Sequence, residues 1–188
     1  MSMQLFQLLN GVTFAALLFV VASGFTLIFG LMRIVNLAHG ALYLLGGYIA
    51  LVAAQKTGSF VVALMAAASG IALLGLAIDR GLLRLVKGVE LRQVLLTLGV
   101  AFVLNDMVLV IWGGDTFTIP TPPLLQGSIQ MGAITYPKFR LFVLAAGVAI
   151  FVGLWLLLNR TRLGALIRAG VDDAEMVQAM GIDIKRVF

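Results

Sequence analysis

Cysteine is absent from this chain, and histidine occurs once, as His39. Disulfide bonds and thiolate metal sites are therefore excluded, and no Cys, His and carboxylate cluster has metal-ligand spacing. The sequence also has no phosphate-binding loop of the G-x-x-x-x-G-K-[ST] type and no G-x-S-x-G nucleophile motif. We therefore expect the chain to be no enzyme and to hold no cofactor and no metal.

Charged residues are scarce, at 11% of the chain against about 25% in a typical soluble domain. Hydrophobic residues make up 62% and gather in long uncharged runs. About 20 apolar residues are needed for a helix to cross a bilayer. Five segments meet this length, at about 11–32, 34–55, 59–78, 93–113 and 141–159. The sequence predicts an all-α, polytopic transmembrane bundle of about five spans, forming a single domain over residues 1–188.

The distribution of basic residues predicts the orientation of these spans. With the N-terminus outside, ten of the 13 Lys and Arg residues lie in the inner connections. Cytoplasmic loops carry such an excess, so we expect the N-terminus outside and the C-terminal segment in the cytoplasm. Topology thus accounts for the net charge of +5, and we expect contact with membrane lipid and none with nucleic acid.

The stretch "RIVNLAHGALYLLGG", residues 33–47, places polar and small residues inside an apolar region. On a helix, Asn36, Gly40, Tyr43 and Gly47 share one face, with His39 beside them. Polar groups in a membrane usually face the bundle interior or a water-filled path. The residues alone leave two interpretations open: a translocation path, or polar groups solvated at the interface with glycines that only pack helices.

A carboxylate, Asp106, lies more than half-way along the fourth predicted span. An aspartate at the centre of a span costs about 2.5–3.5 kcal/mol on insertion scales. We therefore expect Asp106 to face the protein interior, to find a hydrogen-bond donor or to be protonated. A partner within the bundle is favoured over contact with a substrate ammonium group.

The polar segment 160–187 predicts two short helical pieces in the cytoplasm. Asp172 and Glu175 have the spacing of a capping box, and Gly181 suits a helix C-terminus. Met176, Val177 and Met180 would form a small apolar face. A helix this short needs a surface to dock against, which is either the membrane, the bundle or a separate protein.

Three segments of the chain resemble a known family. "GFTLIFGLMRIVNLAHGALYLLGGYIA", residues 24–50, closely resembles the signature of the branched-chain amino acid ABC importer permeases of the LivH type. The resemblance extends to "LLTLGVAFVLND", residues 95–106. It also covers the 160–187 segment, where Val177 stands in place of an alanine that the family pattern carries.

The resemblance implies two groups of functional residues. The translocation path would be lined by Asn36, His39, Gly40, Tyr43, Gly47 and Asp106. The 160–187 segment would couple the permease to an ATPase through Arg162, Gly164, Arg168, Asp172, Asp173, Glu175, Met176, Met180 and Gly181. Family members are longer than this chain, so we expect it to be a truncated product, a fragment or half of a split protein.

The implied function is that of an inner-membrane permease subunit in a bacterial ABC importer for branched-chain amino acids. Its partners would be ABC ATP-binding subunits, a homologous second permease subunit and an extracytoplasmic substrate-binding protein. Urea, short amides or another small solute are alternative substrates. An alternative of another class is a truncated membrane scaffold that transports nothing. A secondary transporter is disfavoured because only one acidic residue lies within a span.

Overall fold

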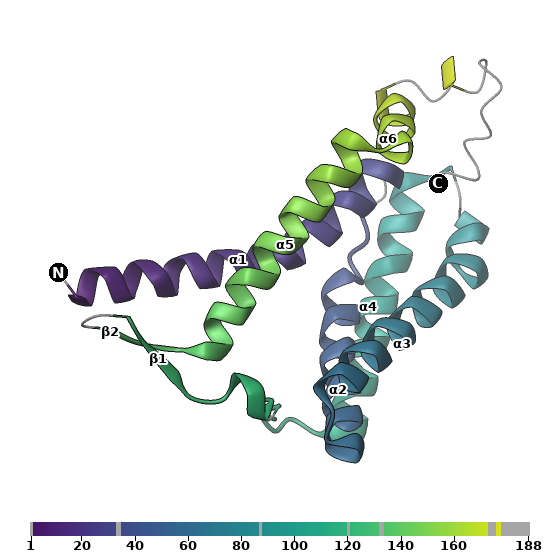
Figure 1. The fold of residues 1–188 in the computed structure, drawn as a ribbon. Helices are drawn as coiled ribbons and strands as arrows, with labels where there is room; N and C mark the ends of the chain where they lie inside the picture. Colours follow the sequence, from purple (N-terminus) through teal and green to yellow (C-terminus); the bar gives the residue numbers. More distant parts are fainter. Residues whose placement is uncertain are drawn as a thin grey trace. The chain divides into compact units, whose positions relative to one another are not determined.

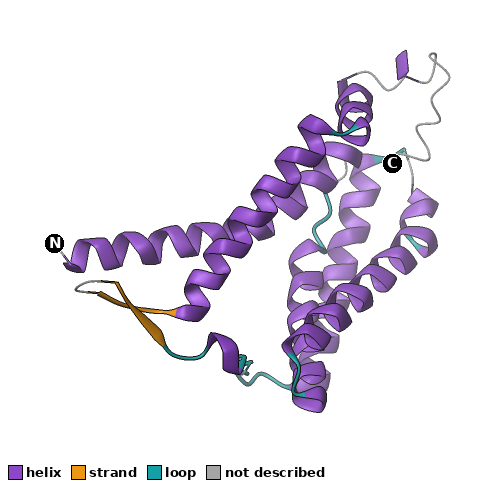
Figure 2. Cartoon of the chain, in the orientation of Figure 1, coloured by secondary structure: helices purple, strands orange, loops and turns teal. Residues whose placement is uncertain are grey.

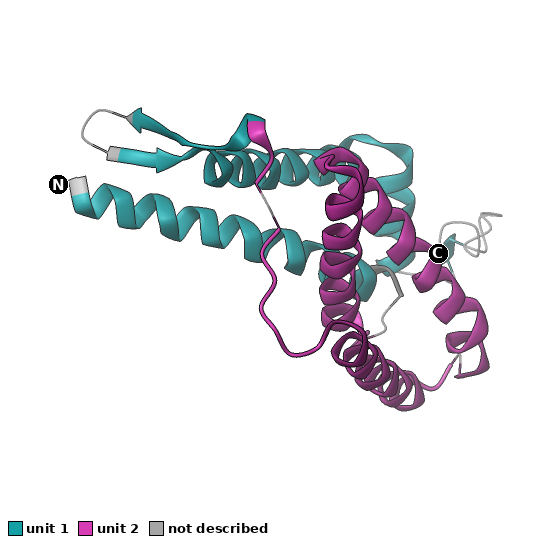
Figure 3. Ribbon diagram, turned by 90° about the horizontal axis from the view of Figure 1, so that it is seen from below, with its two compact units in different colours: residues 1–33, 124–188 teal, residues 34–123 magenta. Residues whose placement is uncertain are grey.

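A computed structural model describes residues 2–32, 35–86, 88–119, 121–131, 134–172 and 176–177 of the chain. Within these ranges helices form most of the structure, and the strands form an antiparallel hairpin (Figures 1 and 2). The chain divides into two compact units, which are described separately. Unit 1 contains residues 1–33 and 124–188, and unit 2 contains residues 34–123 (Figure 3).

Unit 1 is built on two long helices that pack against each other. Its elements are α1 (Ser2–Met32), β1 (Ser128–Met131), β2 (Ile134–Pro137), α5 (Lys138–Arg160) and α6 (Arg162–Asp172). Where α1 meets α5, a Cβ added at Gly147 would lie 3.0 Å from the Cβ of Ala16. The rings of Phe19 and Phe151 meet edge to face, with centroids 5.7 Å apart. Helix α6 contacts both α5 and α1.

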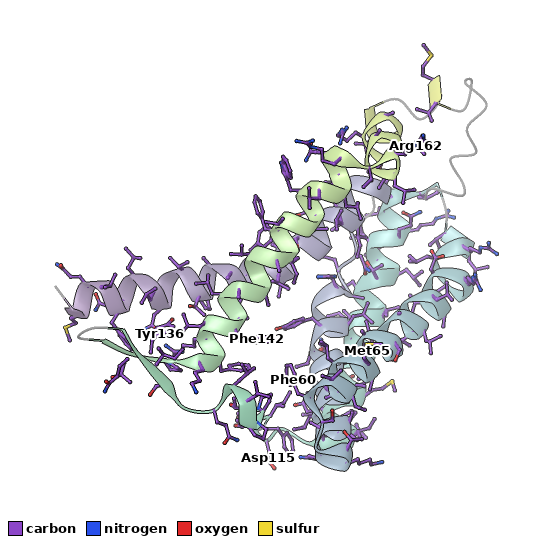
Figure 4. The ribbon with its side chains drawn as sticks, in the orientation of Figure 1. Phe60, Met65, Asp115, Tyr136, Phe142 and Arg162 are labelled. Atoms are coloured by element: carbon purple, nitrogen blue, oxygen red, sulfur yellow. The ribbon has the colours of Figure 1, made fainter. Side chains whose placement is uncertain are left out.

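The β1–β2 hairpin is attached to the first half of α1 by Tyr136, whose side chain is fully buried (Figure 4). The Tyr136 hydroxyl donates to the backbone carbonyl of Leu9 at 3.1 Å and lies 2.9 Å from the Thr13 hydroxyl. The Tyr136 ring meets that of Phe6 edge to face. Arg140, in the first turn of α5, donates to Asn10 of α1.

Unit 2 is a group of three helices in which α2 contacts both α3 and α4. Its elements are α2 (His39–Thr57), α3 (Phe60–Gly81), the 3₁₀ turn η1 (Leu83–Val86) and α4 (Glu90–Trp112), and a second 3₁₀ turn, η2 (Pro123–Leu125), follows at the boundary of the two units. A Cβ added at Gly46 of α2 would lie 3.3 Å from Ile71, and one at Gly70 of α3 would lie 3.2 Å from Ile49. An isoleucine of one helix thus packs against each glycine of the other. Gly70 therefore packs against α2 of the same unit.

Among the described residues, four helical stretches are long and apolar enough to cross a membrane: Met3–Gly30, Phe60–Val86, Glu90–Trp112 and Lys138–Arg160. The predicted polytopic helical fold is therefore confirmed. The remaining predicted span, 34–55, overlaps α2, but α2 begins only at His39 and ends with Gln55, Lys56 and Thr57. These polar ends lower the mean hydropathy of α2, so it is not among the four stretches. The count of five spans and the external N-terminus stay predictions.

Candidate functional site

The chain approaching α2 is not helical, which corrects the prediction that Asn36 lies on a helix face with Gly40. Residues 35–38 form a turn, and α2 starts at His39. The Asn36 side-chain oxygen accepts from the Ala38 N–H at 3.0 Å, and its backbone carbonyl accepts from the His39 N–H at 3.2 Å. Asparagine commonly forms such turns because its short side chain substitutes for a backbone carbonyl. Asn36 therefore shapes the 35–38 turn.

Thr97 of α4 holds this turn in place. Its hydroxyl accepts from the Leu37 N–H at 3.2 Å and lies within donating distance of the carbonyls of Val35, at 3.4 Å, and Val94, at 3.0 Å. The Thr97 side chain is 1% exposed. One buried hydroxyl thus serves non-helical backbone that is about 60 residues away in the sequence.

The position of Thr97 along α4 places the turn beside a helix that is long and apolar enough to cross a membrane. Thr97 follows Glu90, the first residue of α4, by seven positions, which is about 10 Å along the helix axis. Glu90 and Arg92 mark the polar end of α4. Non-helical backbone at membrane depth is tolerated only where protein buries it or where it lines a water-filled cavity. Ala38 of the turn is 1% exposed and Leu37 is 41% exposed, so unit 2 itself covers only part of the 35–38 turn.

Thr97 was not singled out from the sequence, although it lies in a segment quoted for the resemblance. A signal was present in the spacing of the buried residues of α4, which are Gln93, Thr97, Ala101, Leu104 and Val108. These positions recur every three or four residues and define one helix face. Two polar residues on such a face mark a place where side chains must satisfy buried backbone groups.

The face of α2 predicted to line a path is open within unit 2. Gly40, Tyr43 and Gly47 share one side of the helix and are all exposed, and no atom lies within 4 Å of a Cβ added at Gly40 or Gly47. His39 is half-buried at the first position of α2. The neighbouring Gly46, by contrast, packs against Ile71. Of these three glycines, Gly46 packs against a neighbouring helix, whereas Gly40 and Gly47 have open space beside them.

Asp106 lies on the outside of unit 2, and its predicted place in the protein interior stays a prediction. Its side chain is exposed, as is that of Asn105. Leu104 and Val108 belong to the buried face of α4, and a residue two positions from each points to the opposite side. The sequence fixes the depth of Asp106 along α4, but the packing of α2 on the other face decides its exposure. The structure does not bring Asp106 together with the 35–38 turn.

In unit 1, the corner between α5 and α6 is built around Gly164. Thr161 separates the two helices, and its hydroxyl accepts from the Gly164 N–H at 3.0 Å while donating to the Leu157 carbonyl at 2.5 Å. A Cβ added at Gly164 would overlap the carbonyl oxygens of Leu157 and Leu158. Gly164 is therefore required for α6 to start directly against the end of α5.

The other residues predicted for ATPase coupling are only partly covered by the structure. Arg162 (Figure 4) and Arg168 are exposed on α6, and Asp172 is its last residue. Met176 is 62% exposed, and the adjacent Val177 is buried. Four predicted positions lie outside the described residues: Asp173, Glu175, Met180 and Gly181. In the described part of the chain, no group of three or more His, Asp or Glu residues could hold a metal ion.

The fold defines a polytopic helical membrane protein. Residues 7–188 match the model of the family described as "Branched-chain amino acid transport system / permease component", and the chain belongs to this family. The resemblance noted in the sequence is thereby confirmed.

Similar proteins carry related names. The chain is 29% identical to the high-affinity branched-chain amino acid transport system permease protein BraD of Pseudomonas aeruginosa, covering 97% of this chain and 64% of BraD. It is 25% identical to the corresponding protein LivH of Escherichia coli K12 and 24% identical to LivH of Salmonella typhimurium, covering 63% of each. The chain thus spans slightly less than two thirds of these relatives. No solved structure matches it.

Proposed function

We propose that this protein is a permease subunit of an ABC importer that carries branched-chain amino acids across the bacterial inner membrane. Membership of the permease family supports the transport role, and the names of BraD and LivH support the substrate class. The permease itself hydrolyses no ATP in this proposal. Separate ATP-binding subunits supply the energy, and an extracytoplasmic binding protein and a homologous second permease complete the importer.

The observation that carries the proposal is the 35–38 turn held by Thr97 about 10 Å inside α4. Broken backbone at such a depth costs free energy unless it is buried or hydrated, and it is typical of transport paths. If Asn36 were simply solvated at the membrane interface, no buried hydroxyl would be needed to hold the turn. This observation favours the path over simple packing.

The open face of α2 extends this path from the turn. Gly40 and Gly47 leave space beside the helix, while Tyr43 adds a ring with a polar tip. An amphipathic amino acid needs both polar contacts and apolar surface along its route. In this proposal His39 and Asn36 supply polar groups at one end of the face. Asp106 is not needed, because it lies away from the contact of α4 with α2.

The α5–α6 corner is the proposed route for energy from the ATPase. Gly164 and Thr161 fix the start of α6 against the end of α5, so a displacement of α6 is transmitted to a long membrane helix. Arg162 and Met176 are exposed for contact with a partner.

Leucine uptake tests the proposal. Cells that lack their own branched-chain amino acid permease would express this protein with its ATP-binding subunits and binding protein, and radiolabelled leucine would be offered. We expect ATP-dependent uptake that unlabelled isoleucine and valine suppress, and co-purification of the ATP-binding subunits. Uptake suppressed by urea but not by isoleucine would show that the substrate is urea or a related small solute rather than a branched-chain amino acid. Absence of any associated ATPase would refute the importer.

A further inference from the structure

A groove in unit 1 is not used by the proposed function. It has a volume of about 570 Å³ and is lined by side chains of α1, α5 and α6. Most of its lining is apolar, with Phe19 and Leu27 from α1, Phe151 and Trp155 from α5, and Ile167 from α6. Phe151 and Trp155 are about half exposed, so the groove is open at its side. Figure 1 shows these three helices, with α6 at the end of α5.

One end of this groove is polar and basic. Asn159 from the last turn of α5 and Arg168 from α6 both line it. The guanidinium of Arg160 lies 5.8 Å from the centroid of the Trp155 ring, which also lines the groove. From residue 159 to residue 171 the sequence has three arginines and no acidic residue. The local charge therefore favours an anionic ligand.

The arrangement of these groups matches the layers of a bilayer. Tryptophan and arginine are typical of the membrane interface, and the end of α5 is where its apolar run stops. The apolar lining continues from there along α1 and α5, two helices long enough to span the membrane. A ligand here meets hydrocarbon along most of its length and positive charge at one end. Basic pockets between membrane helices bind anionic lipid head groups in this way.

We propose that this groove binds an anionic phospholipid. Its head group lies at Arg168 and Asn159, and an acyl chain runs along Phe19, Leu27 and Phe151. The ligand touches α1, α5 and α6 together, so it stabilises the docking of α6 on the long helices. Arg168 then acts on lipid, whereas Arg162, which does not line the groove, remains exposed for a protein partner.

The two tryptophans of the chain provide a direct test, because Trp155 lines the groove and Trp112 does not. A Trp112→Phe variant of the full chain leaves Trp155 as the fluorophore. The protein would be reconstituted into phosphatidylcholine vesicles in which either brominated phosphatidylglycerol or brominated phosphatidylcholine replaces a fixed fraction of the lipid. Bromine quenches tryptophan at close range, so quenching reports the lipid in the groove.

We expect stronger quenching of Trp155 by brominated phosphatidylglycerol, with a relative binding constant about fivefold above that of phosphatidylcholine for each arginine at the head group. Arg168→Gln should lower this preference about fivefold, and Arg168→Lys should retain it. Arg92→Gln, an exposed arginine of α4 in unit 2, is the matched control and should leave the preference unchanged. A Trp155→Phe variant, which reports from Trp112, should show no preference.

Three outcomes would overturn the proposal. Equal quenching of Trp155 by the two lipids would mean that the groove meets bulk lipid without selecting charge. Weak quenching by both would mean that protein covers the groove. A preference that persists in Arg168→Gln would place the head group elsewhere.

Discussion

Two side chains, Asn36 and Thr97, together shape the non-helical backbone that precedes α2. Asn36 closes the turn locally through the Ala38 N–H, and Thr97 supplies a buried hydroxyl to Leu37 and Val35. Each backbone group left unpaired in an apolar setting costs about 1–3 kcal/mol. The conformation of the turn therefore depends strongly on one threonine.

Thr97→Val tests this dependence, because valine keeps the shape of the side chain and removes its hydroxyl. We expect the free energy of unfolding to fall by about 1–3 kcal/mol, since the Leu37 N–H loses its acceptor. Thr97→Ser, the control, keeps the hydroxyl and most of the stability. Thermal unfolding of the purified protein in detergent measures both. A Thr97→Val protein as stable as the parent would show that the contact contributes nothing.

Asp106→Asn tests whether the carboxylate meets the substrate. Asp106 is exposed on the face of α4 opposite its contact with α2, so we expect leucine uptake to be unchanged. Removing a charge from a membrane helix lowers the cost of insertion, so the amount of protein in the membrane should not fall. Uptake lost at a normal protein level would assign Asp106 a direct role.

At this scale, the sequence predicted Asn36 as important but assigned it the wrong conformation. Gly40 and Gly47 share a helix face as their spacing predicted. Asn36 does not join that face, because its side chain accepts from the Ala38 N–H and so favours a turn over the helix. The role of Thr97 depends on a partner about 60 residues away, which no local pattern reveals. The exposure of Asp106 likewise depends on which face of α4 receives α2.

Among the elements, glycines decide how closely helices approach. Gly46 and Gly70 receive isoleucines between α2 and α3, and Gly147 lies against Ala16 between α5 and α1. Gly164 allows α6 to begin directly against α5. Gly40, Gly47 and Gly153 have no neighbour within 4 Å of an added Cβ. Sequence spacing alone does not divide these glycines into packed and open ones, because the division depends on the partner helix.

Gly164→Ala tests the α5–α6 corner. The added methyl group overlaps the carbonyl oxygens of Leu157 and Leu158, so we expect α6 to shift and stimulation of the ATPase by the permease to be lost. Gly153→Ala on α5 is the matched control. It has open space, and replacing a helical glycine by alanine stabilises by about 0.5–1 kcal/mol. ATPase assays of the reconstituted complex compare the two. Normal stimulation in Gly164→Ala would contradict coupling through this corner.

Tyr136→Phe tests the attachment of the β1–β2 hairpin to α1. The substitution removes the hydroxyl that meets Leu9 and Thr13, and we expect a loss of about 1 kcal/mol in unfolding free energy. Tyr43→Phe, at a 62% exposed position, serves as the control and should change stability little. Equal effects of the two substitutions in thermal unfolding would argue against a structural role for the buried hydroxyl.

For the molecule as a whole, the long uncharged runs were sufficient to predict a polytopic helical membrane protein. The hydropathy of each run depends on its own residues, so four of the predicted spans correspond to described helices of sufficient length. The polar residues at both ends of α2 lower the mean hydropathy of the second run. Helix α1 begins at Ser2, well before the predicted start at 11, because the sequence before residue 11 has no helix-breaking residue.

The central claim is that the open face of α2 beyond the 35–38 turn lines the substrate path, and leucine uptake by Gly40→Leu tests it most directly. A Cβ added at Gly40 meets no atom within 4 Å, and the same holds at the control position Gly153 on α5. We predict that Gly40→Leu abolishes uptake at a normal amount of membrane protein, while Gly153→Leu transports normally. Normal uptake by Gly40→Leu would contradict the claim.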